Sequence, residues 1–329
     1  MDDPTQPSVE QLTQSVETGA YDDATASLRR FETASVDTRK AAVRTVRRLA
    51  NERPVAVGKL LPALAPFLTD DDRSVRLTTS KLFVAVARES PSAVVPRIDD
   101  LAARLADEAE FYYVRARAAE ALGYVAFDYP EEVASPALLA DLRVGLSFDE
   151  PEVREKLAKA LASLAIGDPD RLSHQTSNLG ERLDDDNELV RYHLCTALAV
   201  IGTAFPSALT SVTGPLAERL TDDCPYVRGR AAEALGVVVR AEPVAATLAD
   251  SLSEGANEFE AERVQFVRAA LAGDDPAPDR VASADAIRET TDEIATAVAT
   301  PDSANDCPHC GLSLPDAGPP TCPGCGVPR

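Results

Sequence analysis

Four cysteines near the end of the chain have the spacing of metal ligands. Cys307 and Cys310 form one C-x2-C pair, and Cys322 and Cys325 form a second pair after eleven further residues. Four thiolates can hold one Zn²⁺ ion tetrahedrally, each at about 2.3 Å. Protein ligands would then fill every position and leave none for a bound water. We therefore expect one Zn²⁺ ion with a structural rather than a catalytic role.

Two other interpretations of the four cysteines stay open: iron in the same ligand set, and two disulfide bonds. The chain begins MDDPTQPSVEQL, with neither the basic nor the apolar part of a secretory signal, so we expect a cytoplasmic location, where disulfides are rare. The two segments CPHCG and CPGCG resemble zinc ribbons. This resemblance implies a small zinc-binding module over residues 306–329. From Pro301 onward Arg329 is the one basic residue against three aspartates, which favours contact with protein over nucleic acid.

The composition narrows the class of protein that must carry this module. The 329 residues include 33 Lys and Arg against 54 Asp and Glu, a formal net charge of −21. No segment approaches the roughly 20 apolar residues that span a bilayer, so we expect no membrane insertion. The acidity makes general affinity for nucleic acid unlikely, because phosphates would be repelled. Only five of the basic residues are lysines, and this Asp-rich, Lys-poor surface resembles that of haloarchaeal proteins, whose salt-rich cytoplasm screens self-repulsion.

A repeat of 35 to 39 residues organises the rest of the chain. In each copy an Arg is followed fifteen residues later by a Pro, and apolar residues at helical spacing lie between them. The Pro ends this helix because it lacks a backbone N–H. We call this the B helix of each repeat. The seven pairs are Arg39–Pro54, Arg76–Pro91, Arg115–Pro130, Arg154–Pro169, Arg191–Pro206, Arg228–Pro243 and Arg263–Pro278.

A second, earlier helix is predicted in front of each B helix, with an acidic turn between the two. The predicted ranges are 57–68, 94–106, 136–146, 172–183 and 209–220. Aspartates in the turns, such as Asp70 and Asp222, can accept from the free N–H groups at the start of the B helix. Two helices of this length cannot bury their apolar sides alone, so neighbouring repeats must stack.

The segment LAERLTDDCPYVRGRAAEALGVV, residues 216–238, resembles the HEAT-repeat family, and the match covers residues 20–278. The resemblance implies an all-α protein: an α/α superhelical solenoid of about seven helical hairpins over residues 1–278. A helix and flexible linker over residues 279–305 then lead to the zinc ribbon. In the family the turn Asp and the B-helix Arg form a ladder between repeats. Carried over by position, the structural ladder residues are Arg76, Arg115, Arg154, Arg191 and Arg228.

HEAT solenoids also resemble one another in lining a concave groove with B helices. The fifth residue after each repeat Arg is expected to project into it, and this row runs Arg44, Lys81, Glu120, Lys159, Thr196, Glu233 and Arg268. Residues 29–59 depart from the overall charge, with nine basic residues against three acidic ones. One interpretation is an anchor for an acidic partner, and the other is a solvated helix face. The candidate partner-binding residues are Lys40, Arg44, Arg47, Arg48 and Lys81.

No phosphate loop, dinucleotide fingerprint, nucleophile elbow or His-Glu zinc motif is present. We therefore expect a non-enzymatic protein–protein interaction scaffold, with the groove as first contact surface and the zinc ribbon as second. Two alternatives stay open. One is a nucleic-acid-associated factor that uses residues 29–59 and the ribbon. The other is an enzyme of the bilin-lyase type, because the short repeats of that family resemble these.

Overall fold

The computed structural model describes residues 8–241, 251–274 and 281–299, and within them the regular structure is entirely helical. The chain divides into two compact units, Met1–Arg171 and Leu172–Arg329, called unit 1 and unit 2 below. Among the described residues no helix is long and apolar enough to cross a membrane. The predicted all-helical solenoid is therefore confirmed for this part of the chain, whereas the predicted zinc ribbon, residues 306–329, lies outside it.

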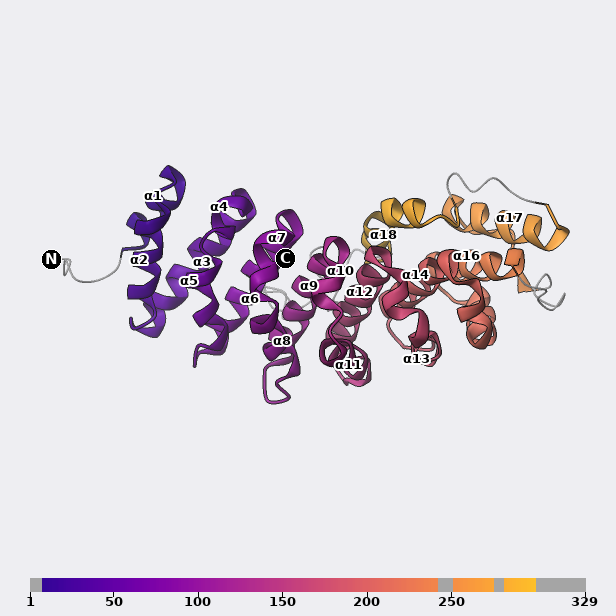
Figure 1. Ribbon diagram of the computed structural model, residues 1–329, viewed down its shortest axis with the longest axis horizontal. Helices are drawn as coiled ribbons and strands as arrows, with labels where there is room; N and C mark the ends of the chain where they lie inside the picture. Colours follow the sequence, from indigo (N-terminus) through magenta and orange to yellow (C-terminus); the bar gives the residue numbers. More distant parts are fainter. Residues whose placement is uncertain (1–7, 242–250, 275–280, 300–329) are drawn as a thin grey trace, which may run out of the picture. The chain divides into compact units, whose positions relative to one another are not determined.

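Both units are built around long B helices. Unit 1 begins with α1 (Val9–Thr18) and α2 (Tyr21–Phe31), and four B helices of 17 residues follow: α3 (Val36–Glu52), α6 (Arg73–Glu89), α9 (Tyr112–Asp128) and α12 (Pro151–Gly167). Unit 2 contains the B helices α14 (Glu188–Ala204), α16 (Pro225–Ala241) and α17 (Glu258–Ala272), and a further helix, α18 (Ala284–Ala299), that packs on α14. Consecutive B helices within a unit pack side by side (Figure 1).

The ends of the B helices follow from a few residue types. Asp72 and Asn187 cap the starts of α6 and α14, where each side chain accepts from two backbone N–H groups. At the other end, the residue before the repeat proline leaves the helical region in the five repeats where the structure describes it; Arg53 before Pro54, for example, has φ −142° and ψ 58°. The proline ring disfavours helical geometry in the residue before it. The repeated Pro therefore both ends one helix and starts the next segment.

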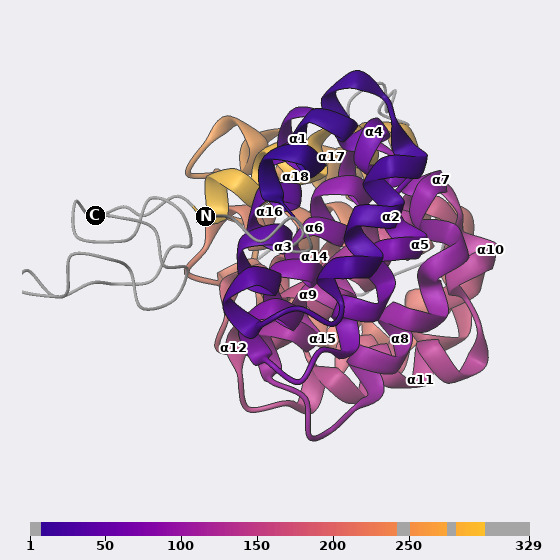
Figure 2. The ribbon, with the colours of Figure 1, turned by 90° about the vertical axis from the view of Figure 1, so that its left-hand side faces the viewer.

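The earlier segments, which we call the A segments, are mostly not the single helices predicted from the sequence. Most are divided into short α and 3-10 segments, and in the first two repeats Pro62, Pro66 and Pro96 interrupt the backbone hydrogen bonds. The predicted range 172–183 is divided without an internal proline, whereas the predicted range 136–146 agrees with α11 and the η3 turn that follows it. In unit 1 they are α4 (Pro54–Gly58), α5 (Leu61–Leu64), η1 (Ala65–Thr69), α7 (Pro91–Val94), η2 (Val95–Arg97), α8 (Ile98–Ala106), α10 (Pro130–Val133), α11 (Pro136–Val144) and η3 (Gly145–Ser147). Further along the chain they are η4 (Pro169–Gln175), α13 (Thr176–Gly180), η5 (Pro206–Val212), α15 (Thr213–Glu218) and η6 (Arg219–Thr221). Figure 2 shows unit 1 as two layers, with B helices on one side and A segments on the other.

A ladder of Arg–carboxylate pairs joins successive repeats. The Arg is the fourth residue of its B helix, and both oxygens of a carboxylate at or near the next turn accept from its Nε and Nη2 atoms. The pairs are Arg39–Asp70, Arg76–Glu110, Arg191–Asp222 and Arg228–Glu260, with Nε–oxygen distances of 2.6, 2.8, 2.7 and 2.6 Å. The Nη1 atoms of all four also donate to carbonyls of the preceding turn, as Arg39 does to Ala34 and Arg76 does to Asp70, each at 2.7 Å. Each Arg thus fixes two turns at once.

The ladder changes at Arg115. Its Nε donates to the Leu105 carbonyl at 3.0 Å, and its guanidinium stacks on the Phe148 ring with 4.0 Å to the centroid. Phe148 lies three residues before its B helix, the place that Asp70 and Asp222 take in their repeats. Arg154 donates to the carbonyls of Phe148 and Asp149, at 2.9 and 3.0 Å.

The seventh Arg–Pro pair is out of phase with the others. Arg263 is the sixth residue of α17, not the fourth, because Asn257 caps that helix. Its guanidinium donates to Glu233 and to the Phe259 carbonyl instead of joining a turn. The Arg–Pro spacing therefore continues into the last repeat, whereas the place of the Arg in its helix does not.

Candidate interaction surface

The B helices of unit 1 turn one side toward the A segments and the other side outward (Figure 2). The sixth and ninth residues of each B helix share the outward side, because residues three apart lie on one helix face. We call this side the B face. In unit 1 these places carry five cations and one anion: Arg44, Lys81, Arg117, Lys156 and Lys159, with Glu120. The B face of unit 1 is therefore cationic in a chain of net charge −21.

Three exposed arginines stand together on α3. Arg44, Arg47 and Arg48 lie at i, i+3 and i+4, so they occupy one face, opposite the buried residues Ala42 and Leu49. Within the described residues none of the three forms an ion pair or an intramolecular hydrogen bond. The guanidinium groups are therefore available to an external carboxylate or phosphate.

The two predicted lysines of this patch are less available. Lys40 Nζ lies 2.8 Å from Asp72 Oδ2, and this hydrogen bond lowers the pKa of the Asp72 carboxyl. The charge of Lys40 is thus already neutralised within the unit. Lys81 is half-buried on α6 and has its own intramolecular interaction. Of the five predicted partner-binding residues, the structure leaves the three arginines as the exposed group.

A charge network on α9 and α12 continues the B face. Glu120 accepts from Arg117 and lies 3.7 Å from Lys156 Nζ, which also contacts Glu155 at 2.7 Å. Burial raises the pKa of Glu120, but Lys156 and Arg117 outweigh it and hold the pKa below its usual value. Lys159 Nζ lies 3.3 Å from the Tyr124 hydroxyl. This network fixes its long side chains, in contrast to the arginines of α3.

In unit 2 the helix α18 covers the B face. The expected groove residues Thr196 and Glu233 are completely buried, and so is Arg230. Thr196 and Glu233 therefore do not project into an open groove, as their place in the row had suggested. Arg268 remains exposed, but it is the eleventh residue of α17 and donates to backbone carbonyls of Leu252 and Ser253.

Beneath α18 lies a buried ionic cluster that sequence reasoning missed. Glu233 Oε2 accepts from Arg230 at 2.6 Å and from Arg263 at 3.0 Å, while its Oε1 accepts from the Ala282 N–H at 2.7 Å. The only signal was a recurring Arg at the sixth place of α16 and α17. That signal becomes visible only once the start of α17 is known.

The cysteines divide into two groups. Cys307, Cys310, Cys322 and Cys325 lie outside the described residues, so their role as zinc ligands stays a prediction. Cys195 and Cys224 are buried free thiols, and burial raises the pKa of Cys195 to about 12, which keeps it protonated and unreactive at neutral pH. Within the described part of the chain, no cluster of three or more His, Cys, Asp or Glu side chains could hold a metal ion.

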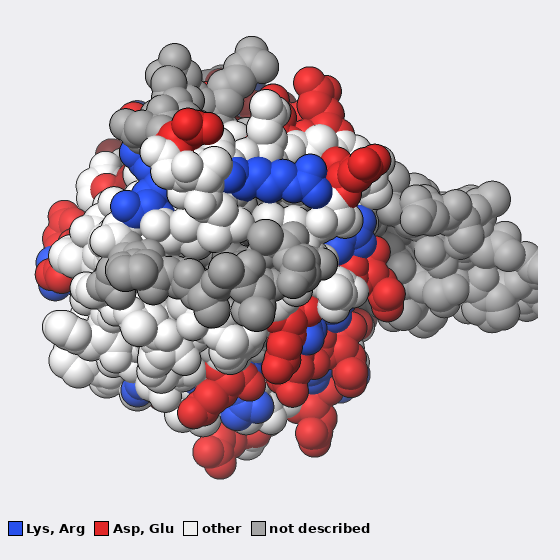
Figure 3. Space-filling model, turned by 90° about the vertical axis from the view of Figure 1, so that its right-hand side faces the viewer, with Lys and Arg blue, Asp and Glu red and all other residues white. Residues whose placement is uncertain are grey.

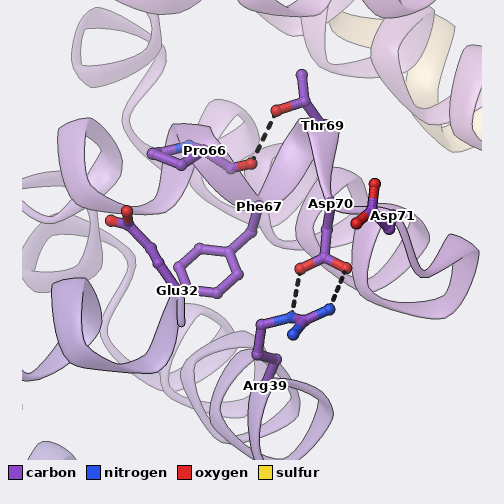
Figure 4. A pocket seen from close by; sticks show the side chains of 7 residues that line it. All are labelled: Glu32, Arg39, Pro66, Phe67, Thr69, Asp70 and Asp71. Carbon is purple, nitrogen blue, oxygen red and sulfur yellow. Dashed lines mark hydrogen bonds and ion pairs between the residues drawn. The ribbon is translucent and has the colours of Figure 1, made fainter. Parts of the chain in front are cut away.

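A shallow hollow of about 250 Å³ lies beside the first ladder pair (Figure 4). Glu32, Phe67 and Asp71 line it, and its one cation, Arg39, is paired with both oxygens of Asp70. Because this cation is already used between repeats, we assign the hollow to the ladder and not to a ligand.

Acidic side chains outnumber basic ones on another part of the surface. Figure 3 faces the α17 end of unit 2, where Asp and Glu side chains form several clusters and Lys and Arg side chains are fewer. The three unpaired arginines of α3 are therefore a local reversal of the charge found elsewhere.

The HEAT-repeat family profile matches residues 98–174 and 176–288, and a profile of HEAT-like repeats matches residues 36–86. A search of the curated proteins found no match.

Several solved structures share the fold. An engineered protein is 19% identical with a TM-score of 0.61, over 89% of this chain and 77% of that chain. A designed armadillo repeat protein is 20% identical with a TM-score of 0.54, over 64% of this chain and 99% of that chain. Another designed armadillo repeat protein, in complex with the peptide (KR)4, is 19% identical with a TM-score of 0.52, over 70% of this chain and 99% of that chain. At these identities the likeness concerns the fold alone.

Proposed function

Because the chain belongs to the HEAT-repeat family, we propose that it is a protein-interaction scaffold whose unit 1 binds an acidic segment of a partner protein. The observation that carries this proposal is the group Arg44, Arg47 and Arg48, exposed on one face of α3 with no ion pair among the described residues. Each guanidinium can bind a carboxylate through two parallel hydrogen bonds. Lys81 and the cations of α9 and α12 continue the positive charge along the B face.

The fold is also suited to holding an extended peptide, because it presents similar helices at regular intervals. One designed armadillo relative is in complex with the peptide (KR)4, a segment of alternating cations. The B face of unit 1 is itself cationic, so it would repel such a peptide and favours a segment of alternating carboxylates. The net charge of −21 repels a phosphate backbone and an acidic peptide alike, so a direct comparison of the two ligands has to separate them.

The test is the affinity of a fluorescein-labelled (DE)4 peptide for the full chain, measured by anisotropy at 0.1 M KCl. The variant Arg44→Glu/Arg47→Glu/Arg48→Glu should weaken binding by about tenfold or more, because three attractive contacts become repulsive. A matched control, Arg29→Glu/Arg30→Glu/Arg53→Glu, makes the same change of charge at exposed residues outside the α3 patch and should have a much smaller effect.

Equal losses in the two triple variants would show that only net charge matters and would refute the patch. A single-stranded 20-nucleotide DNA serves as the second probe. If the chain bound this DNA more tightly than the peptide, a nucleic-acid ligand would replace the acidic protein segment in the proposal.

For the end of the chain we propose that Cys307, Cys310, Cys322 and Cys325 hold one structural Zn²⁺ ion in a ribbon that forms a second protein contact. Their paired C-x2-C spacing supports this ligand set. We further propose a salt-rich cytoplasm as the working environment, on the basis of five lysines among 33 basic residues. Binding experiments should accordingly be repeated at molar KCl.

A further inference from the structure

Helix α18 lies on the B face of unit 2, alongside α14 (Figure 1). Only a few residues of α18 are buried in this contact. Of its sixteen residues only Ala286, Ile287, Thr291 and Val298 are buried, and most of the others are exposed. The B helices α14 and α16, in contrast, are buried on nearly all sides.

The surface that α18 covers is polar. Arg230 and Glu233 are completely buried, and Arg263 is 1% exposed. The Tyr192 hydroxyl lies among them and donates to the Thr291 carbonyl at 3.3 Å. A surface meant for permanent burial is normally apolar. Charged and hydroxyl groups, by contrast, can be hydrated whenever the covering helix leaves.

The hydrogen bonds across this contact do not fully satisfy the arginines. Arg230 Nη2 donates to Thr290 Oγ1 at 2.9 Å, to Thr291 Oγ1 at 3.4 Å and to the Ile287 carbonyl at 3.5 Å. All three acceptors are neutral. Arg230 Nε is buried and has no hydrogen-bond partner in the described part of the chain.

The charges in this cluster also indicate that the arginines are incompletely compensated. The cluster holds two buried guanidinium groups, Arg230 and Arg263, against one buried carboxylate, Glu233; a partly exposed second carboxylate, Glu262, lies 3.9 Å from Arg263 Nη1 only. Removing such groups from water is costly, and neutral oxygens offset that cost less than a carboxylate does. The face beneath α18 is thus better matched to a helix that brings a negative charge than to α18 itself.

We propose that α18 is a displaceable occupant of this face, and that the face binds an amphipathic helix of a partner protein that carries a glutamate at the place of Thr290. Such a carboxylate would lie where Thr290 Oγ1 now accepts from Arg230. The seated α18 itself shows that a helix fits. This second surface is distinct from the arginines of α3, so the two proposals can fail independently.

The probe is a labelled peptide with the sequence of residues 284–299 and the substitution Thr290→Glu. It is titrated into the full chain and into the full-length variant Ile287→Asp, which places a charge at a completely buried residue of α18 and so weakens docking of the chain's own helix. The matched control is Thr296→Asp, which adds the same charge on the exposed side of α18. A peptide of the natural sequence measures what the added glutamate contributes.

The Thr290→Glu peptide should bind the Ile287→Asp chain about tenfold more tightly than it binds the wild type or the Thr296→Asp chain. It should also bind that chain about tenfold more tightly than the natural peptide does. Equal binding of the two peptides, or no binding of either to a folded Ile287→Asp chain, would overturn the proposal.

Hydrogen exchange on the unmodified chain decides the case even if Ile287→Asp fails to fold. The amides of α18 should exchange at least tenfold faster than those of α14, because α18 leaves the face while the rest of unit 2 stays folded. Equal protection in α18 and α14 would make α18 a fixed part of the core and would overturn the proposal.

Discussion

Replacing Asp222 by asparagine tests the ladder at a place where the structure sets the magnitude. Asp222 is 2% exposed at its side chain, and its two oxygens accept from Arg191 Nε at 2.7 Å and Nη2 at 2.8 Å. Asparagine keeps one acceptor for the Cys224 N–H but loses the charge and one of the two bonds from Arg191. Breaking a fully buried ion pair costs about 3–5 kcal/mol.

The expected loss is smaller than that, because Arg191 keeps its bonds to the carbonyls of Asp185 and Asp186 and is 13% exposed. We expect the free energy of unfolding to fall by about 2–3 kcal/mol, the upper range for a hydrogen bond to a charged group. Urea unfolding followed by circular dichroism measures it. The control Asp223→Asn removes the same charge from the neighbouring exposed residue and should cost less than about 0.5 kcal/mol. Equal costs in the two variants would show that the ladder does not stabilise the repeats.

Three further predictions concern packing, pH and metal. A Cβ at Gly123 would lie 2.9 Å from the Ala160 Cα, so Gly123→Ala should destabilise by about 1–3 kcal/mol in thermal unfolding, whereas Gly214→Ala, with open space around it, should not destabilise. Burial raises the pKa of the Glu233 carboxyl, but Arg230 and Arg263 outweigh burial and hold this pKa below its usual value. The ionised carboxylate therefore stabilises the folded chain above the pKa of an unfolded glutamate, about 4.3, and this contribution is lost as the pH falls further. Glu233→Gln should reduce the fall in the free energy of unfolding below that pH. An unchanged pH dependence in this variant would contradict the proposed contribution of Glu233. Elemental analysis should find one zinc per chain, and Cys307→Ser should lower that content without changing the far-ultraviolet circular dichroism of the helices.

The B helices could be predicted from the sequence because their determinants are local. An Arg, a stripe of apolar residues and a Pro fifteen residues after the Arg specify a helix that ends before the Pro, as in α6 and α14. The A segments depend on competing local signals. Apolar spacing in the predicted helix 57–68 favours one helix, but Pro62 and Pro66 divide it.

The covered face of unit 2 could not be predicted, because its determinants are distant in sequence. Arg230 meets Thr290 across 60 residues, and neither residue is unusual in its own helix. Thr196 and Glu233 therefore resembled groove residues until α18 was placed over them. On α3 the same row is open, and the arginines predicted as a binding surface are exposed there.

The charge preference of unit 1 tests the central claim most directly. Labelled (DE)4 and (KR)4 peptides are titrated into the full chain at the same ionic strength, and into the variant Arg44→Glu/Arg47→Glu/Arg48→Glu. We predict that the wild type binds (DE)4 at least about tenfold more tightly than (KR)4, and that the variant loses this preference. Equal affinity for the two peptides, or tighter binding of (KR)4 by the wild type, would contradict the claim that this scaffold selects acidic segments.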